Sequence, residues 1–425
     1  MENQNVLLEQ LYLALAPDLC VFTGEKLEDL QRLITNLDEI EPHQAFFLLR
    51  NCLSIPRLMY LLRSSPAWQR PEILSQFDVL IREKAESICN INFQGSSWQQ
   101  ASLPVRFGGL GLRECFQISL PCYLSSREAS AQLMAHILSE YSGLNPSRES
   151  DVALDAWAEV SRELPQVRTS QRAWDEIAIK KSHENLLSQA DQQSRARLLA
   201  AEHGEAGAWL HALPVSNVGN LLSHDELRIA VALRVGANIT VDSRCRCGKT
   251  MNALGTHGLS CRLNAGRFPR HSELNRIIHQ TLARINIPSR LEPTGLMRGD
   301  GKRPDGLTLC PWERGRCLVW DATVVDTFAQ SHVLHCAVEA GKAAEAAEVL
   351  KAHKYSELSD NYIFQPVAFE TSGAAGPDSR LFIKKLGRML VQSSGDVREH
   401  AFLNERISIC IARGNAASIL SCLER

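Results

Sequence analysis

The segment that most restricts the fold of this chain is residues 317–326, CLVWDATVVD, in which apolar and β-branched side chains follow one another almost without interruption. A strand that is apolar on both faces is typical of a central strand that helices cover on both sides. A second buried strand is expected at residues 364–369. Helical spacing marks residues 276–287, 337–358, 381–390 and 401–412. The pattern predicts an α/β domain in this part of the sequence.

Asp321 stands in the middle of this apolar strand, and Asp305 precedes it by sixteen residues in the segment GDGKRPDG. A carboxylate inside a buried strand is costly unless it is paired or holds a cation. Two carboxylates that converge from a strand and from the loop before it suit Mg²⁺ or Mn²⁺, and such an ion activates water for phosphodiester cleavage. The alternatives are a turn-forming Asp305 and a buried, hydrogen-bonded Asp321 that holds no metal.

Three lysines lie on the predicted helix 337–358, at Lys342, Lys351 and Lys354. In a helical projection Lys354 shares an inward-facing stripe with Ala343, and Lys351 lies on the adjacent stripe. A lysine that reaches the two carboxylates would stabilise the charge that develops on a phosphate, or would position the attacking water. Ordinary surface charge is the alternative.

Cysteine and histidine residues precede this domain in the pattern C-x-C-x9-H-x3-C. Its members are Cys245, Cys247, His257 and Cys261. In extended backbone the first two thiols share one face, and in a helix the last two residues share another. Such a closed set suits tetrahedral Zn²⁺ in a structural site, with unliganded buried thiols as the alternative. The thirteen cysteines are too sparse for a disulfide scaffold, so we expect a reducing, intracellular compartment.

Positive charge is concentrated around these motifs. Residues 241–305 contain twelve Lys or Arg and five Asp or Glu, whereas the whole chain has a formal net charge of −2. A site for a polyanion must therefore be local, which excludes a protein that is basic over its whole surface. Arg262, Arg267 and Arg270 are the predicted phosphate contacts, because basic residues beside a zinc-bound loop would bind nucleic acid.

The first half of the sequence is predicted to be helical, with prolines between apolar residues at three-and-four spacing. Trp157 and Trp174 are expected to be core residues. Ser223 and Glu226 form a capping box at the start of a helix. Residues 98–113, WQQASLPVRFGGLGLR, are expected to form an irregular glycine-rich turn. No apolar stretch is expected to span a membrane.

In their order along the chain, these motifs resemble the C-terminal half of a non-LTR retrotransposon polyprotein that carries a restriction-like endonuclease. That class has a CCHC zinc knuckle, an R-H-x3-N segment, and a nuclease with K/R-P-D, a second Asp and K-x2-K-Y. The matching residues are Cys245, Cys247, His257, Cys261, Arg270, His271, Asn275, Arg303, Pro304, Asp305, Asp321, Lys351, Lys354 and Tyr355. The glycine-rich segment is similar to the one that follows the palm in reverse transcriptases of this group, so the resemblance covers most of the chain.

The resemblance implies an α+β fold with a largely helical N-terminal half. Its expected parts are a helical reverse-transcriptase-thumb-like region (1–140), a helical linker (141–240), a small zinc-knuckle-like segment (241–275) and an α/β restriction-endonuclease-like domain of the PD-(D/E)xK type (276–425). It implies that Asp305, Asp321, Lys351 and Lys354 are catalytic. The nucleic-acid contacts would then also include His271, Asn275 and Arg303.

Two departures limit what the resemblance implies. No Asp-Asp pair occurs in the 425 residues, so the chain lacks the metal-binding aspartates of a polymerase palm and would not be a reverse transcriptase by itself. Asp321 is followed by Ala and Thr, whereas a PD-(D/E)xK nuclease has Lys two residues after its acid. A lysine from the following helix would therefore take that role.

The sequence thus predicts a protein of retrotransposon origin that nicks DNA with Mg²⁺ or Mn²⁺, carries structural Zn²⁺ and has no polymerase activity. Its expected partners are DNA, element RNA and a separate reverse transcriptase, its expected location is the nucleus, and no membrane contact is expected. The first alternative is a domesticated or decayed fragment that binds nucleic acid or a partner without cleavage. The second is a helical interaction scaffold with incidental thiols.

Overall fold

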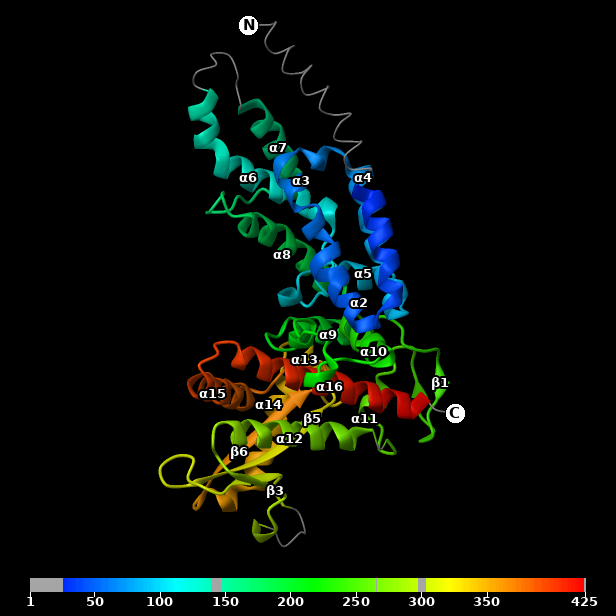
Figure 1. Cartoon of the computed structure of the whole chain (residues 1–425). Helices are drawn as coiled ribbons and strands as arrows, with labels where there is room; N and C mark the ends of the chain where they lie inside the picture. Colours follow the sequence, from blue (N-terminus) through cyan, green and yellow to red (C-terminus); the bar gives the residue numbers. More distant parts are fainter. Residues whose placement is uncertain (1–25, 139–146, 265, 297–302, 424–425) are drawn as a thin grey trace, which may run out of the picture. The chain divides into compact units, whose positions relative to one another are not determined.

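The computed structural model describes residues 26–138, 147–264, 266–296 and 303–423 (Figure 1). Helices predominate and two small sheets accompany them, so the predicted α+β class is confirmed. The chain divides into two compact units. Unit 1 comprises Met1–Ile88, Ala101–Leu103 and Gly111–Ser188, and unit 2 comprises Cys89–Gln100, Pro104–Leu110 and Gln189–Arg425.

Unit 1 is helical throughout its described part. Its main helices are α2 (Pro42–Leu48), α3 (Met59–Ser64), α4 (Pro71–Cys89), α6 (Cys115–Leu138), α7 (Ser147–Val160) and α8 (Gln171–Gln189). Trp157 of α7 and Trp174 of α8 pack edge to face in its core, with ring centroids 5.0 Å apart. Each indole N–H donates to a backbone carbonyl, of Glu163 and Arg168 respectively. The predicted burial of both tryptophans is confirmed.

One stretch in the described part of unit 1, Pro42–Ser64, has the length and hydropathy of a membrane span, which differs from the sequence-based expectation. Half of its most apolar window is buried inside the protein. The backbone changes from α to π to 3₁₀ helix within the stretch. Because a buried core helix passes the same test of length and composition, this stretch is weak evidence for contact with a membrane.

A four-stranded sheet forms the centre of unit 2. Its strands are, in spatial order, β3 (Ser289–Leu291), β4 (Gly306–Thr308), β5 (Cys317–Val325) and β6 (Tyr362–Glu370). The first three pair antiparallel, whereas β5 and β6 are parallel along their whole length. A parallel pair needs a crossover, and α14 (Lys342–Lys354) lies in it. The two strands predicted from apolar runs are thus confirmed, and the structure places them side by side.

The two faces of the sheet pack against different helices. One face contacts α12 (Arg267–Arg284), α15 (Pro377–Ser394) and α16 (Glu399–Leu423). Trp320 of β5 belongs to the core formed with these three helices. On the opposite face Ala344 of α14 packs with Ala368 of β6. Because side chains alternate along a strand, Asp321 points to the α14 face.

Shorter elements complete unit 2. They are α5 (Ser96–Ala101), α9 (Gln192–Glu202), α10 (His224–Val235), the hairpin strands β1 (Ser243–Arg244) and β2 (Thr250–Met251), α11 (His257–Ser260) and α13 (Val333–Cys336). The capping box is present at the start of α10, where Ser223 Oγ accepts from the Glu226 backbone N–H and the Glu226 carboxylate accepts from the Ser223 backbone N–H. This prediction is confirmed.

The helices predicted in this part of the chain differ from the structure in their bounds, and α15 and α16 are longer than expected. α12 begins at Arg267 rather than at residue 276, because its first turn tolerates Pro269 and packing compensates for its polar composition. The expected border between residues 275 and 276 therefore lies inside a helix. The helix expected over residues 337–358 is shorter, because Gly341 adopts a left-handed φ of +84° and α14 starts directly after it.

Candidate functional site

Asp321 and two of the predicted lysines meet on the α14 face of the sheet. Asp321 is 3% exposed. Lys351 Nζ donates to Asp321 Oδ1, and Lys354 Nζ lies 3.7 Å from Asp321 Oδ2. Both lysines lie in the last turn of α14, so one helical face delivers both ammonium groups. Lys342, in the first turn, pairs with two glutamates instead.

Asp305 lies directly before β4 and is tied to the residue next to Asp321. Its Oδ2 accepts hydrogen bonds from the backbone N–H of Ala322 at 2.7 Å and from His271 Nε2 at 2.9 Å. Burial alone would raise the pKa of Asp305, but the contact with His271 and the bond from Ala322 lower it below its usual value. The hydrogen bond to Asp305 raises the pKa of His271 against the effect of desolvation. Both shifts favour the charged pair.

α12 brings His271 and Asn275 to this place, four residues apart on one helical face. Asn275 is 5% exposed, and its Oδ1 accepts from Trp320 Nε1 at 3.0 Å. The resemblance implies that both residues contact nucleic acid; in the structure His271 binds Asp305 and Asn275 binds Trp320 of the core strand β5. The His-x3-Asn spacing signals a shared face, but it does not reveal which partner that face meets.

Tyr355 contacts this site as well, although its place in the K-x2-K-Y motif does not indicate what it does there. Its hydroxyl donates to the backbone carbonyl of Arg303 at 2.9 Å, and Lys354 Nζ donates to that hydroxyl at 2.7 Å. The Lys354 ammonium also lies 4.3 Å from the centre of the ring. Tyr355 therefore ties the Arg-Pro-Asp segment to α14 and orients Lys354. The Arg303 side chain forms an ion pair with Glu292.

We refer to Asp305, Asp321, Lys351, Lys354 and His271 as the acid–lysine cluster. It combines carboxylate oxygens, which bind hard cations, with ammonium groups that can neutralise a phosphate. The Lys351 ammonium lies against Asp321 Oδ1, where a divalent cation would bind. Within the described ranges, the spacing of ligand atoms expected for a metal centre occurs only at the cysteine and histidine motif. Cation binding here would therefore require Lys351 to move.

A second group of side chains consists of the four predicted zinc ligands, and we call it the Cys₃His cluster. Their ligand atoms all lie within 4.8 Å of one another. Cys245 Sγ is 3.6 Å from Cys261 Sγ, and Cys247 Sγ is 3.1 Å from His257 Nε2. Three sulfur ligands and one nitrogen ligand at these separations could bind Zn²⁺.

The local backbone folds so that the first two thiols meet. The Cys245 N–H donates to Lys249 O at 3.0 Å, and the Gly248 N–H donates to Cys245 O at 2.9 Å. Gly248 has a φ of +83°, which the tight turn requires and a glycine adopts freely. Burial alone would raise the pKa of Cys245, but hydrogen bonds from the other three members lower it to about 6. The thiolate is the form that binds a metal.

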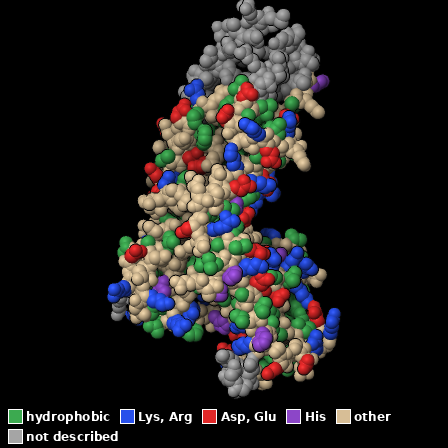
Figure 2. Space-filling view, turned by 180° about the vertical axis from the view of Figure 1, so that it is seen from behind, with side chains coloured by type: hydrophobic (Ala, Val, Ile, Leu, Met, Phe, Trp, Pro, Cys, Tyr) green, Lys and Arg blue, Asp and Glu red, His purple; other side chains and the backbone are tan. Residues whose placement is uncertain are grey.

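The predicted phosphate contacts differ in their exposure. Exposed or partly exposed arginines around the Cys₃His cluster are Arg244, Arg246, Arg262 and Arg267. Arg270 is only 3% exposed, and its guanidinium donates to Asn415 Oδ1 of α16. A phosphate would not reach Arg270 while α12 and α16 stay packed, because its side chain fills the space between them. Figure 2 shows that, on the face it draws, Lys and Arg side chains are interspersed with Asp and Glu.

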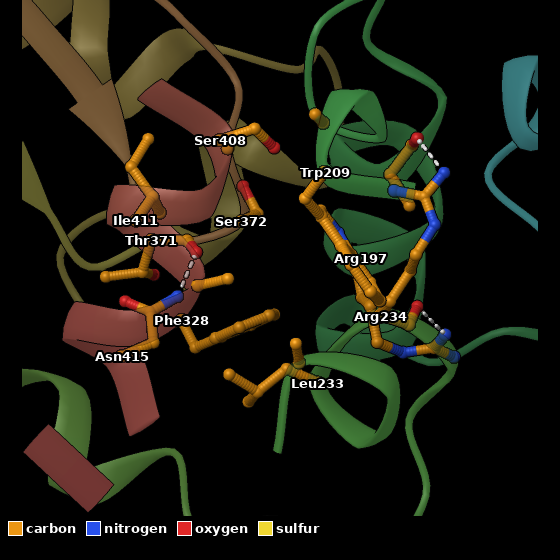
Figure 3. Close-up of a pocket in the computed structure, with 15 residues that line it drawn as sticks. Arg197, Trp209, Leu233, Arg234, Phe328, Thr371, Ser372, Ser408, Ile411 and Asn415 are labelled. Atoms are coloured by element: carbon orange, nitrogen blue, oxygen red, sulfur yellow. Dashed lines mark hydrogen bonds between the residues drawn. The ribbon is translucent and has the colours of Figure 1, made fainter. Parts of the chain in front are cut away.

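A pocket in unit 2 is lined by residues of α9, α10, α16 and the loop after β6, and by no member of either cluster (Figure 3). On one side the Arg234 guanidinium donates to the carbonyls of Val105 and Gly109, in the glycine-rich segment. On the other side Asn415 Nδ2 donates to Thr371 O at 2.6 Å. These polar groups are engaged in holding the fold, so the pocket is a weaker candidate than the two clusters.

No protein-family model matches this chain. No curated protein matches its sequence either. The function therefore has to be inferred from the chemistry of the acid–lysine and Cys₃His clusters.

Proposed function

We propose that unit 2 contains a metal-dependent endonuclease that nicks DNA, of the restriction-like type that the motifs resemble. The observation that supports it is that Asp305 accepts from the backbone of Ala322, the residue after Asp321, while the last turn of α14 pairs with Asp321, so that three separate segments come together. These are the K/R-P-D, second-acid and K-x2-K-Y motifs. Titratable groups gathered against a buried strand are costly to a fold and are typical of functional sites.

Each member of the acid–lysine cluster has a role in this proposal. Asp305 and Asp321 would hold Mg²⁺ or Mn²⁺, which supplies an activated water. Lys351 would turn from Asp321 to the scissile phosphate, and with Lys354 it would neutralise the charge that develops there. His271 would keep Asp305 ionised and correctly oriented, acting through that carboxylate.

We also propose that the Cys₃His cluster binds one Zn²⁺ in a structural site, because four protein ligands leave no open position for catalysis. The exposed Arg244, Arg246 and Arg262 would then contact DNA phosphates around a rigid loop. A retrotransposon origin, with element RNA and a separate reverse transcriptase as further partners in the nucleus, belongs to the same proposal.

A nicking assay tests the proposed chemistry. Purified protein is incubated with supercoiled plasmid in Mg²⁺ and in Mn²⁺, and nicked circles are measured on gels. Asp305→Ala and Asp321→Ala should each abolish nicking without weakening DNA binding, because each removes a cation ligand and a negative charge that repels phosphate. Asp360→Ala, an exposed acid between α14 and β6, is the matched control and should nick normally. Intact plasmid with the wild-type protein in both ions would exclude the endonuclease.

Binding without cleavage is the second candidate function. It is favoured by one observation, the ion pair in which Lys351 covers Asp321 Oδ1. A cluster that holds its acids in ion pairs can stabilise the fold and bind nucleic acid through the arginines alone. The same assay separates the two, since in this case the wild-type protein shifts the plasmid on a gel but leaves it supercoiled.

A further inference from the structure

The last turn of α16 packs beside the Cys₃His cluster. Figure 1 shows the C-terminal end of this helix next to β1, the strand that directly precedes Cys245. Asn264, three residues after Cys261, donates from Nδ2 to Ser418 O and accepts from Ser421 Oγ at Oδ1. Gly258 of α11 lies so close to α16 that a Cβ there would be 2.9 Å from Ile419 Cα. These contacts hold the end of α16 in place beside the cluster.

This packing brings a fifth cysteine to the cluster. The next residue after Ser421 is Cys422, whose thiol interacts electrostatically with the thiols of Cys245 and Cys261. It is partly exposed and belongs to the last described turn of the chain. The spacing of the C-x-C-x9-H-x3-C motif gives no hint of it, because it follows Cys261 at a great distance in the sequence. Cys422 is thus a fifth donor beside the four whose ligand atoms lie within 4.8 Å of one another, and Zn²⁺ takes four.

We propose that Cys422 is a reserve ligand of the metal centre, able to complete a Cys₄ set with Cys245, Cys247 and Cys261 when His257 is not bound. This inference rests on the zinc site proposed above. Cys422 interacts with Cys245 and Cys261, whereas Cys247 Sγ lies 3.1 Å from His257 Nε2, so loss of the imidazole leaves Cys422 next to two of the three remaining ligands. Thiolates are the softer ligands and suit Zn²⁺ at least as well as imidazole does.

Such an exchange would link the metal to the C-terminal helix. α16 reaches from the main core of unit 2, through Leu403, Ile407 and Cys410, to the Cys₃His cluster. A bond from zinc to Cys422 would anchor the last turn of this helix. It would also change the charge of the metal centre by about one unit, because a thiolate replaces a neutral imidazole.

Removal of His257 tests the proposal in the full chain. The variants are His257→Asn, Cys422→Ser and the double variant, each analysed for zinc content and for absorption after replacement of zinc by Co²⁺. Wild type and Cys422→Ser should hold about one zinc per chain with three thiolates, and His257→Asn should keep the metal with Co²⁺–thiolate absorption about one third higher. The double variant should bind zinc at least about tenfold more weakly than His257→Asn. His257→Asn combined with Cys52→Ser, an exposed cysteine of unit 1, is the control.

The outcomes separate this proposal from the zinc site itself. Wild-type protein without zinc would overturn both. Wild-type protein with zinc, together with equal metal loss in His257→Asn and in the double variant, would overturn only the reserve ligand. A second measurement does not depend on the variants folding. Metal-free wild-type protein is treated with diamide, which accepts two electrons and two protons as two thiols form a disulfide. Because Cys245 and Cys261 can also join each other, mass spectrometry should find Cys422 joined to one of them in a fraction of the chains, and Cys422 joined only to cysteines outside the cluster would contradict the proximity.

Discussion

The ion pair between Lys351 and Asp321 determines what either residue can do. The side chains are 23% and 4% exposed, respectively. A carboxylate so deeply buried is costly without a cationic partner, so Lys351 stabilises the fold whether or not it acts in catalysis. If a Lys351 variant loses nicking activity, that loss therefore has to be compared with the loss of stability of the same variant.

Lys351→Ala is expected to lower the free energy of unfolding by about 2 kcal/mol, less than the roughly 3–5 kcal/mol typical of a broken buried pair. The reason is that Lys354 remains 3.7 Å from Asp321. Adding Asp321→Asn should recover most of the loss, because the unpaired charge is then removed. Urea denaturation measures both effects. Lys384→Ala, an exposed lysine of α15, is the control, and a Lys351→Ala variant as stable as this control would contradict the prediction.

The pair of His271 and Asp305 predicts a dependence of stability on pH. The pKa of His271 is raised in the folded protein, so its contribution is complete below the unfolded-state value of about 6.5 and is lost as the pH rises through the folded-state value. The pKa of Asp305 is lowered, so its contribution is complete above about 3.9 and is lost as the pH falls through the folded-state value. The pair therefore stabilises the protein most between about pH 4 and 6.5.

His271→Gln should consequently cost more stability at pH 5.5 than at pH 8.5. The difference is expected to be at most about 1 kcal/mol, because the His271 side chain is 43% exposed and solvent screens the pair. Urea denaturation at both pH values, in buffer without Mg²⁺, measures it. His224→Gln, an exposed histidine of α10, is the matched control. An effect of His271→Gln that is the same at both pH values would show that the charged pair does not form.

At the scale of elements, the β1–β2 hairpin and α11 are too short to be stable by themselves. Each strand has two residues and the helix has four. Isolated hairpins and single helical turns are at best marginal in water, so a bound metal would supply much of the folding free energy of this segment.

Cys245→Ser combined with Cys247→Ser should therefore abolish zinc binding, because too few donors remain even if Cys422 takes part. Elemental analysis of reduced protein measures the metal, and limited proteolysis should then cut within residues 241–264 while the helices of unit 1 stay intact. Cys310→Ser with Cys317→Ser, two partly exposed cysteines outside the cluster, is the control. Retention of about one zinc by the first variant would show that the metal lies elsewhere.

At the scale of the whole molecule, the distribution of charge bears on the proposed binding of DNA. The formal net charge of the chain is −2, although residues 241–305, taken by themselves, contain more Lys and Arg than Asp and Glu. In the proposed complex with DNA, the remainder of the chain would repel a duplex, and association would depend on the arginines around the Cys₃His cluster.

DNA affinity should fall steeply with salt, as counterion release requires. Replacing Arg244, Arg246 and Arg262 together by Ala should reduce the slope of log K against log salt by roughly 2–3, at about 0.9 for each phosphate contact. Fluorescence anisotropy with a labelled duplex measures the slope. Arg168, Arg172 and Arg314 replaced by Ala are the control, since these arginines lie outside the cluster region. An unchanged slope in the first variant would exclude this surface as the contact.

Local patterns in the sequence were sufficient where neighbouring residues decide the structure. The strands β5 and β6 follow from continuous apolar runs, and the start of α10 follows from the Ser223–Glu226 capping box. The Cys₃His cluster follows from the spacing of its members, because a tight turn and one helical turn bring them together. In each case the interacting groups are close in sequence, so spacing is itself a geometric constraint.

Only the tertiary structure decided which distant residues meet. His271 reaches Asp305 across 34 positions and Lys351 reaches Asp321 across 30, because α12 and α14 pack on the sheet in one particular register. The same packing buries Arg270 against α16 and brings Cys422 to the Cys₃His cluster. Spacing shows that a residue faces inward, but its partner depends on how whole elements fit together. Burial of the shared apolar core sets that fit.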